Sequence, residues 1–84
     1  MFAIKLDNQP RDFLKKCETE IYDRIKEKLK GLQENPVLHD AKRVVGYREP
    51  TFRVRVGKYR ILYRINYEAN LIVVAKIDHR ETVY

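Results

Sequence analysis

The amino-acid sequence predicts an α+β fold in the order β-α-α-β-β-β, with an N-terminal helical hairpin packed on one face of a small, mainly antiparallel four-stranded sheet. Three patterns lead to this prediction. Residues 52–65 alternate in polarity around a glycine, apolar residues within 13–32 recur every three or four positions, and residues 71–77 form an apolar, β-branched run. The chain has 84 residues, a length that predicts a single domain over 1–84 with a small core.

Residues 52–65 are typical of a β-hairpin, because successive side chains in a strand point to opposite faces of the sheet. Gly57 and Lys58 fit a two-residue loop, since glycine at the first loop position favours a type II′ turn. In the resulting register the apolar pairs are Val56 with Tyr59, Val54 with Ile61, and Phe52 with Tyr63. The tyrosines expected on this core-facing side are Tyr59, Tyr63 and Tyr67.

The other face of the hairpin is basic. Arg55 faces Arg60 in this register, and Arg53 faces Leu62. Like charges directly opposite one another destabilise a sheet by up to roughly 1 kcal/mol per pair. We therefore expect an anionic group, most simply a phosphate, to bind this face, and we expect removal of Arg60 to relieve repulsion in the free protein.

The N-terminal part of the chain predicts one strand and two helices. Alternation over residues 2–6 indicates the first strand. The apolar stripe that follows indicates amphipathic helices at 9–16 and 19–33, and Pro36 ends the second because it disfavours helical backbone at the preceding residue. The stripe consists of Phe13, Leu14, Cys17, Ile21, Ile25, Leu29 and Leu32.

The remaining segments predict a loop and a last strand. Residues 36–50 show no clean period and are expected to form a loop that holds a short turn near 39–43. Residues 68–70 fit a three-residue hairpin loop with Asn70 in the left-handed region, before a strand at 71–77. The expected pairs are Ile65 with Val73, Tyr63 with Ala75, and Ile61 with Ile77. This register adds neighbours to the basic face, which then carries Arg60, Lys76, Asp78 and Arg80.

The net charge of the protein indicates which kinds of partner it can bind. The net charge of +6 predicts affinity for nucleic acid, for an anionic membrane surface or for an acidic protein. No apolar run approaches the roughly 20 residues of a membrane span, and the N-terminus lacks the apolar core of a signal peptide. The single cysteine, Cys17, excludes an internal disulfide. These features predict a cytoplasmic protein.

Two stretches resemble a known family. The run Phe-Arg-Val-Arg-Val-Gly-Lys-Tyr-Arg-Ile-Leu-Tyr at 52–63 is similar to the central hairpin of the RelE/ParE superfamily of toxins from prokaryotic type II toxin–antitoxin modules, and the segment 78–84 is similar to that family's ending. The resemblance implies the same β-α-α-β-β-β fold. RelE-like members are ribosome-dependent endoribonucleases (mRNA interferases) that cleave messenger RNA in the decoding site, and ParE-like members inhibit DNA gyrase.

The resemblance implies a toxin that inhibits translation by cleaving mRNA, with a non-enzymatic gyrase inhibitor as the alternative. A third reading is a basic RNA-binding module without toxicity. The implied partners are a small, acidic, RelB-like antitoxin and the ribosome with bound mRNA. No His, Cys, Asp or Glu cluster has metal-ligand spacing, so we expect neither a metal nor an organic cofactor.

The resemblance also implies the site residues. It matches basic positions of the RelE hairpin to Arg53, Arg55 and Arg60, the arginine that ends the last strand to Arg80, and the tyrosine that stacks on a messenger base to Tyr84. Metal-free cleavage needs cations that stabilise the charged phosphorane, and the planar guanidinium suits this task. The residues expected to do so are Arg60 and Arg55.

The proton-transfer groups are less clear. Arginine does not deprotonate in proteins, so the hairpin arginines leave the general base open. The candidates for proton transfer are His79, because the ordinary pKa of histidine lies near neutrality, and Tyr84. The alternation that places Arg80 on the basic face, however, points His79 to the other side.

Overall fold

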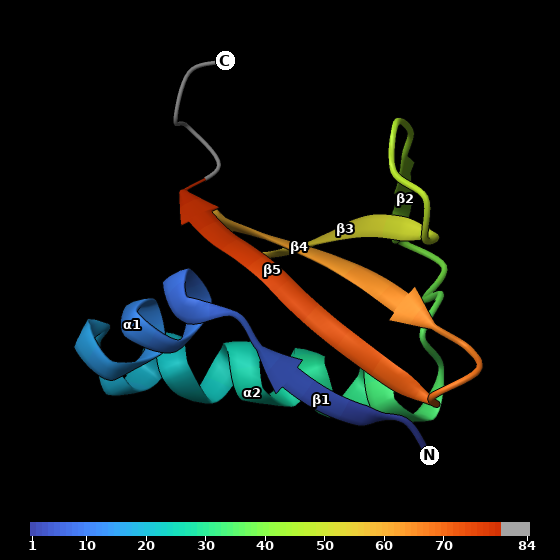
Figure 1. Ribbon diagram of the computed structural model, residues 1–84. Helices are drawn as coiled ribbons and strands as arrows, with labels where there is room; N and C mark the ends of the chain where they lie inside the picture. Colours follow the sequence, from blue (N-terminus) through green and yellow to red (C-terminus); the bar gives the residue numbers. More distant parts are fainter. Residues whose placement is uncertain (80–84) are drawn as a thin grey trace.

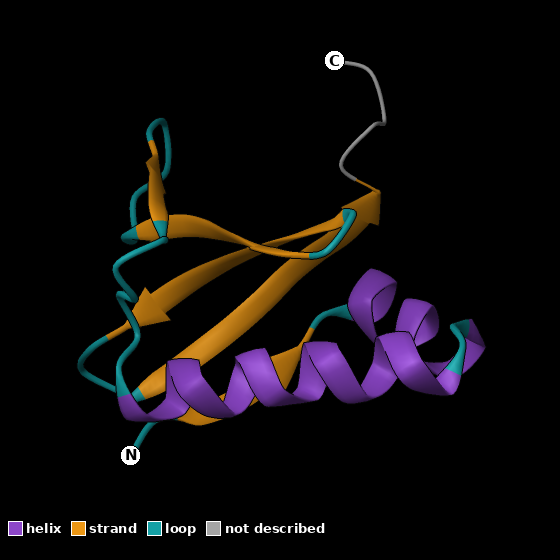
Figure 2. Ribbon diagram, turned by 180° about the vertical axis from the view of Figure 1, so that it is seen from behind, coloured by secondary structure: helices purple, strands orange, loops and turns teal. Residues whose placement is uncertain are grey.

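Two helices cover one face of a five-stranded sheet in the computed structural model, which describes residues 1–79 (Figure 1). Figure 2 shows the longer helix running beneath the sheet, with the opposite face uncovered by helices. The elements are β1 (Ala3–Leu6), α1 (Asn8–Lys16), α2 (Thr19–Glu34), β2 (Lys42–Val44), β3 (Thr51–Val56), β4 (Tyr59–Asn66) and β5 (Leu71–His79). The predicted fold class is confirmed, and each helix lies within one residue of its expected bounds.

The sheet has one strand more than predicted. Its strand order is β1-β5-β4-β3-β2, with β1 parallel to β5 and the other neighbours antiparallel. The additional strand, β2, lies at the edge within the segment expected to be a loop. It has three residues, too few to show a period of two, and it is defined by its antiparallel pairing with β3.

The central hairpin has the predicted register. Val56 lies opposite Tyr59, Arg55 opposite Arg60, and Arg53 opposite Leu62. Gly57 has a φ of 57°, and within residues 1–79 the only non-glycine residue with positive φ is Asn70, which leaves Lys58 with negative φ. This combination fits the type II′ turn, in which only the first loop residue has positive φ.

The register between β4 and β5 differs from the prediction. Ile61 lies opposite Ile77 as expected, but the observed partners further along are Val74 for Tyr63 and Ile72 for Ile65. A β-bulge next to Leu62 and Tyr63 leaves Ala75 as an extra residue. The bulge keeps Ile72, Val74 and Ile77 buried. Strict alternation could not place it because residues 71–75 are all apolar.

The β4–β5 loop and its tyrosine also need correction. The loop spans the four residues 67–70 instead of three, although Asn70 has the expected left-handed backbone, with φ of 56°. Tyr67, expected in the core, is 55% exposed and places its ring edge-on to Phe2. Because the loop begins at Tyr67, this residue lies beyond the covered part of the sheet.

The core lies between α2 and the sheet. Ile25 and Leu32 of α2 are fully buried against strand residues that include Tyr63 and Ile61. Complete burial of each such side chain contributes about 1.5–3 kcal/mol. The Tyr63 hydroxyl donates a hydrogen bond to the Pro36 carbonyl at 2.7 Å, and burial raises the pKa of Tyr63 above its ordinary value. None of the helices within residues 1–79 is long and apolar enough to span a membrane.

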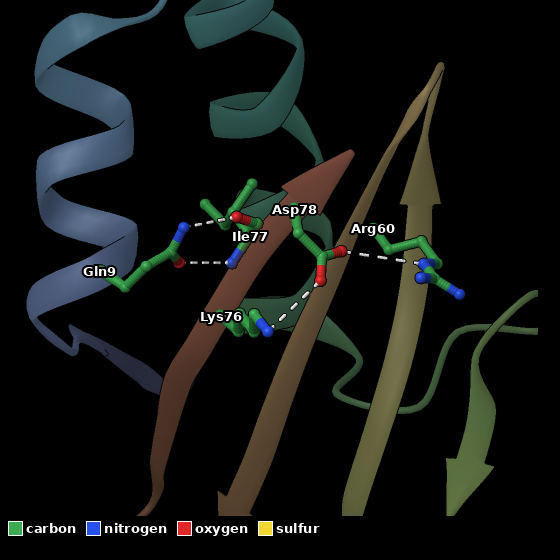
Figure 3. A network of polar contacts seen from close by, with 5 residues as sticks. All are labelled: Gln9, Arg60, Lys76, Ile77 and Asp78. Atoms are coloured by element: carbon green, nitrogen blue, oxygen red, sulfur yellow. Dashed lines mark hydrogen bonds and ion pairs between the residues drawn. The ribbon is translucent and has the colours of Figure 1, made fainter. Parts of the chain in front are cut away.

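A glutamine side chain continues the edge of the sheet beyond β1. Pairing of β1 with β5 ends at Leu6 and Val74. Further along β5, Gln9 donates a hydrogen bond to the Ile77 carbonyl at 2.7 Å and accepts one from the Ile77 N–H at 2.8 Å (Figure 3). Gln9 thus makes the hydrogen bonds that a neighbouring strand would make. It does so at the part of β5 whose polar side chains lie on the open face of the sheet.

Candidate functional site

A cleft of about 450 Å³ lies on the sheet face opposite the helices. Strand alternation forms it, because residues that flank the buried Val54 and Ile61 must point away from the core. The side chains that line the cleft are Val44, Tyr47, Arg53, Arg60, Leu62, Lys76 and Asp78. They come from β2, β3, β4, β5 and the β2–β3 loop.

The cleft is cationic. It contains three positively charged side chains, Arg53, Arg60 and Lys76, and one carboxylate, Asp78. Like charges that line a concave surface raise the local concentration of an oppositely charged ligand. Guanidinium groups bind phosphate oxygens through paired hydrogen bonds. The cleft can therefore hold a phosphate and stabilise negative charge that develops on it.

Arg60 and Asp78 lie next to each other in the cleft. They are directly opposed on β4 and β5, and Arg60 Nε lies 3.8 Å from Asp78 Oδ1. The other carboxylate oxygen lies 3.7 Å from Lys76 Nζ (Figure 3). The side chains of Arg60 and Asp78 are 15% and 20% exposed, whereas that of Lys76 is 56% exposed. Asp78 thus lies between a largely buried and an exposed cation.

The structure separates the hairpin arginines that sequence reasoning grouped together. Arg53 and Arg60 line the cleft, but Arg55 is exposed and does not. Arg55 lines two other hollows, one of about 310 Å³ beside residues 39–42 and one of about 580 Å³ beside α2. Arg53 also lines the first of these hollows, so it connects Arg55 to the cleft.

His79 lies on the opposite side of the sheet from the cleft. It is paired with Tyr59 across β4 and β5, and the two rings meet edge to face with centroids 5.3 Å apart. Tyr59 also contacts Phe13 of α1 in the same geometry. The orientation predicted from alternation is therefore correct, and His79 is not among the cleft residues. The two remaining predicted site residues, Arg80 and Tyr84, lie outside the described residues.

Two parts of the cleft were not predicted as functional residues. Tyr47 is 54% exposed in the loop between β2 and β3, next to Gly46 with its φ of 100°. The loop has no periodic pattern from which the position of this ring could be predicted.

Asp78 was expected on the basic face but not as the partner of Arg60. The predicted pairing of Ile61 with Ile77 implied that contact, because the preceding residue on β4 then faces the following residue on β5.

Metal ligands do not gather in the part of the chain that the structure describes: within residues 1–79 no three His, Cys, Asp or Glu side chains come together as a metal site requires. The groups that the cleft offers to a ligand are cations, one carboxylate and an aromatic ring. This set suits a phosphate ester that carries a base.

Known proteins share this fold and part of this sequence. Residues 4–84 match the family model of the ParE toxin of type II toxin–antitoxin systems. RelE1 of Methanocaldococcus jannaschii is 30% identical over 86 aligned residues, which cover 99% of this chain and 94% of that protein. The archaeal RelE–RelB complex from Pyrococcus horikoshii OT3 contains a chain with a TM-score of 0.85 at 24% identity, and the match covers 98% of both chains.

A toxin–antitoxin complex from Mycobacterium tuberculosis, RelBE2, also resembles the protein, with a TM-score of 0.78 and 30% identity over 94% of this chain and 91% of that one. The family model and the sequence relative span nearly the whole chain, including all five strands and both helices. The chain therefore belongs to the ParE toxin family of type II toxin–antitoxin systems and is a RelE-like toxin of the RelE/ParE superfamily.

Proposed function

We propose that this toxin is a ribosome-dependent endoribonuclease that cleaves mRNA in the decoding site and so inhibits translation. The observation that carries the proposal is the cleft on the open face of the sheet, where Arg53, Arg60 and Lys76 surround a space of about 450 Å³. The full-length similarity to RelE1 of M. jannaschii supports it. An mRNA target on the ribosome would place the action of the toxin in the cytoplasm.

The proposed reaction is attack of a ribose 2′-hydroxyl on the adjacent phosphate without a metal ion. Its transition state carries extra negative charge on the phosphate oxygens, which Arg60 and Arg53 are suited to stabilise. Arg60 is the stronger candidate, because its side chain is 15% exposed and solvent screens a buried charge less. Arg55 would bind the flanking RNA backbone from its position outside the cleft.

Two further residues are assigned to the proposed site on the basis of the family resemblance alone. We assign Arg80 to phosphate binding and Tyr84 to stacking on a messenger base, a contact worth roughly 1–3 kcal/mol for an aromatic side chain. His79 receives no role in the cleft, because its ring packs against Tyr59 on the other side of the sheet.

We also propose that a RelB-like antitoxin binds this toxin. The related chains from P. horikoshii and M. tuberculosis come from complexes with antitoxins. A net charge of +6 favours a partner that is acidic where it meets the basic face. Such a partner would neutralise the toxin by covering the cleft.

A second candidate function is inhibition of DNA gyrase by binding alone. It is favoured by the family model, which is that of the ParE toxin. Primer extension on a translated message and a gyrase supercoiling assay, run side by side with purified toxin, separate the two. We expect new cuts in the message only when ribosomes are present, and unchanged supercoiling. Lost supercoiling with an intact message would replace the nuclease proposal by the gyrase alternative.

A further inference from the structure

We infer that Lys42, Arg53 and Arg55 form a second phosphate-binding site, which holds an RNA phosphate other than the one that is cut. The inference rests on the proposed nuclease function and extends it by one site. The three cations line the hollow of about 310 Å³ beside β2, which we call the edge site and whose volume lies within the range of small-ligand sites. The side chains that line it are His39, Asp40, Ala41, Lys42, Arg53 and Arg55.

Strand β2 brings a second pair of like charges to the open face of the sheet. Lys42 on β2 lies directly opposite Arg53 on β3, so both side chains leave the sheet on the face that carries the cleft. Arg55 follows Arg53 by two residues and points to the same face. Like charges at opposed positions of a sheet repel each other. An anion that binds among these cations replaces the repulsion by attraction.

The three cations of the edge site are available to a ligand. Within residues 1–79, no carboxylate forms an ion pair with Lys42, Arg53 or Arg55. Lys42 and Arg55 are exposed, and Arg53 is partly buried. A ligand therefore does not have to displace a protein carboxylate from any of them.

The wall of the edge site opposite β3 is fixed and nearly neutral. Its carboxylate belongs to Asp40, whose Oδ2 lies 2.9 Å from Lys28 Nζ of α2. This pairing offsets the charge of Asp40 with a cation that does not line the site. The turn before β2 is closed by a hydrogen bond of 2.8 Å that the Ala41 N–H donates to the Leu38 carbonyl, and both side chains pack against the core. The edge site thus has a formed wall and an excess of positive charge.

The edge site continues the cleft, because Arg53 lines both. RNA carries a phosphate on every nucleotide, so a strand whose scissile phosphate occupies the cleft has further phosphates beside it. Residues two apart on one face of a strand, such as Arg53 and Arg55, are separated by about 6.5 Å. This distance is similar to that between consecutive phosphates of an extended RNA strand. Guanidinium groups bind phosphate oxygens through paired hydrogen bonds, and Lys42 adds a compact charge.

The phosphate has two sources in the proposed complex with the ribosome. It belongs either to the message beside the cut or to ribosomal RNA that lines the decoding site. The chemical group is the same in both cases, and the edge site recognises that group. Only an experiment that changes the message alone separates the two sources.

The test measures binding of the toxin to ribosomes whose message carries a 2′-deoxy nucleotide at the cut site, over a range of KCl concentrations at constant Mg²⁺. The proteins are wild type, Lys42→Gln and the control Lys30→Gln, which removes the same charge from an exposed position of α2 on the other face of the sheet. We expect Lys42→Gln to weaken binding by about 3- to 10-fold. The slope of log affinity against log salt should fall by about 0.7–0.9, because one phosphate contact fewer releases fewer counterions. Lys30→Gln should match wild type in both quantities.

A neutral analogue of the phosphate identifies its source. Each message would carry one methylphosphonate, in which a methyl group replaces a charged oxygen, at a single 2′-deoxy position beside the cut. If a message phosphate occupies the edge site, Lys42→Gln and wild type should bind one of these messages equally. If ribosomal RNA supplies the phosphate, Lys42→Gln should keep its full effect on every message. Either result supports the edge site.

A variant that keeps the charge separates charge from folding. Lys42→Arg should bind like wild type, and Lys42→Gln should not unfold at lower urea concentration, because it loses the repulsion from Arg53. If Lys42→Gln has the affinity and salt slope of wild type, or if Lys42→Arg binds as weakly as Lys42→Gln, the edge site is overturned, whatever the antitoxin does. A wild type that neither binds nor cleaves on programmed ribosomes overturns the proposed function together with it.

Discussion

Arg60 and Asp78 lie directly opposite each other on β4 and β5, with Arg60 Nε 3.8 Å from Asp78 Oδ1 and both side chains largely shielded from solvent. Opposite charges at cross-strand positions contribute roughly 0.2–1 kcal/mol, about the magnitude that like charges cost. Arg60 therefore has an attractive neighbour on one side, Asp78, and a repulsive one on the other, Arg55. The prediction that removal of Arg60 would relieve repulsion took account of Arg55 but not of the attraction between Arg60 and Asp78.

Arg60→Ala should separate activity from stability. We expect the single-turnover cleavage rate to fall by about 10²- to 10³-fold, the usual effect of removing one donor to a developing oxyanion. Loss of the Asp78 contact and loss of repulsion from Arg55 nearly cancel, so the free energy of unfolding should fall by no more than about 1 kcal/mol. Denaturant unfolding and cleavage on ribosomes measure the two quantities. Lys30→Ala, which removes an exposed charge from α2, is the control. Equal cleavage by both variants would contradict the proposed role.

Tyr47→Ala should weaken substrate binding more than it slows the chemical step. The ring is half-exposed at the rim of the cleft that we propose binds phosphate, and stacking of a base on such a ring contributes roughly 1–3 kcal/mol. The half-saturating concentration of programmed ribosomes should rise about 5- to 150-fold. Tyr47→Phe keeps the ring and should behave like wild type. If Phe and Ala substitutions weaken binding equally, the hydroxyl and not the ring makes the contact.

Gln9→Ala should loosen the end of β5. The substitution removes both side-chain hydrogen bonds to Ile77, each worth about 0.5–1.5 kcal/mol. Hydrogen exchange of the Ile77 amide should therefore accelerate, and cleavage should slow because Asp78, the next residue, lies against Arg60 in the cleft. Gln33→Ala is a matched control, since it removes one hydrogen bond of 2.9 Å to the Phe2 carbonyl at the other end of the sheet. If the Ile77 amide exchanged equally slowly in both variants, the Gln9 side chain would not be what holds the end of β5.

Asp40 should make a small, pH-dependent contribution to stability. Lys28 Nζ donates a hydrogen bond to Asp40 at 2.9 Å, and this bond lowers the pKa of the carboxyl below its ordinary value of 3.8. A lowered folded-state pKa stabilises the protein above the unfolded value, and the stabilisation disappears as the pH falls through the folded value. The pair is partly exposed, so Asp40→Asn should cost about 0.2–1 kcal/mol at neutral pH.

Urea unfolding at neutral and at acidic pH measures that contribution. The wild type should be the more stable protein at neutral pH, and the difference from Asp40→Asn should vanish below the folded-state pKa. A difference that grows on acidification would have the wrong sign for this ion pair.

The parts of the fold with a clear period were predictable from sequence. Alternation around Gly57 gave the hairpin register, and the spacing from Phe13 to Leu32 gave both helices. The bulge at Ala75 lies within an apolar run, where moving the alternation by one residue leaves the pattern of polarity unchanged. Strand β2 depends on its pairing with β3, and three residues are too few to show a strand pattern of their own.

The candidate site was predictable where it lies on the hairpin. Arg53 and Arg60 share the cleft because both alternate with core residues on adjacent strands. Arg55 follows the same alternation but lies nearer the turn, beyond the cleft. The position of Tyr47 could not be predicted from the sequence, because it depends on the position of the edge strand β2 and of the loop that follows it.

Analysis of the RNA ends tests the central claim most directly. Purified toxin would be mixed with ribosomes that hold a defined codon in the decoding site, and the fragments would be sequenced with their terminal groups identified. We predict a cut within that codon that needs the ribosome, a 2′,3′-cyclic phosphate on one fragment, a 5′-hydroxyl on the other, and no cut when the 2′-hydroxyl at that position is replaced by hydrogen. Equal cleavage of free RNA, or fragments that end in a 3′-hydroxyl and a 5′-phosphate, would contradict a ribosome-dependent nuclease that uses the 2′-hydroxyl as its nucleophile.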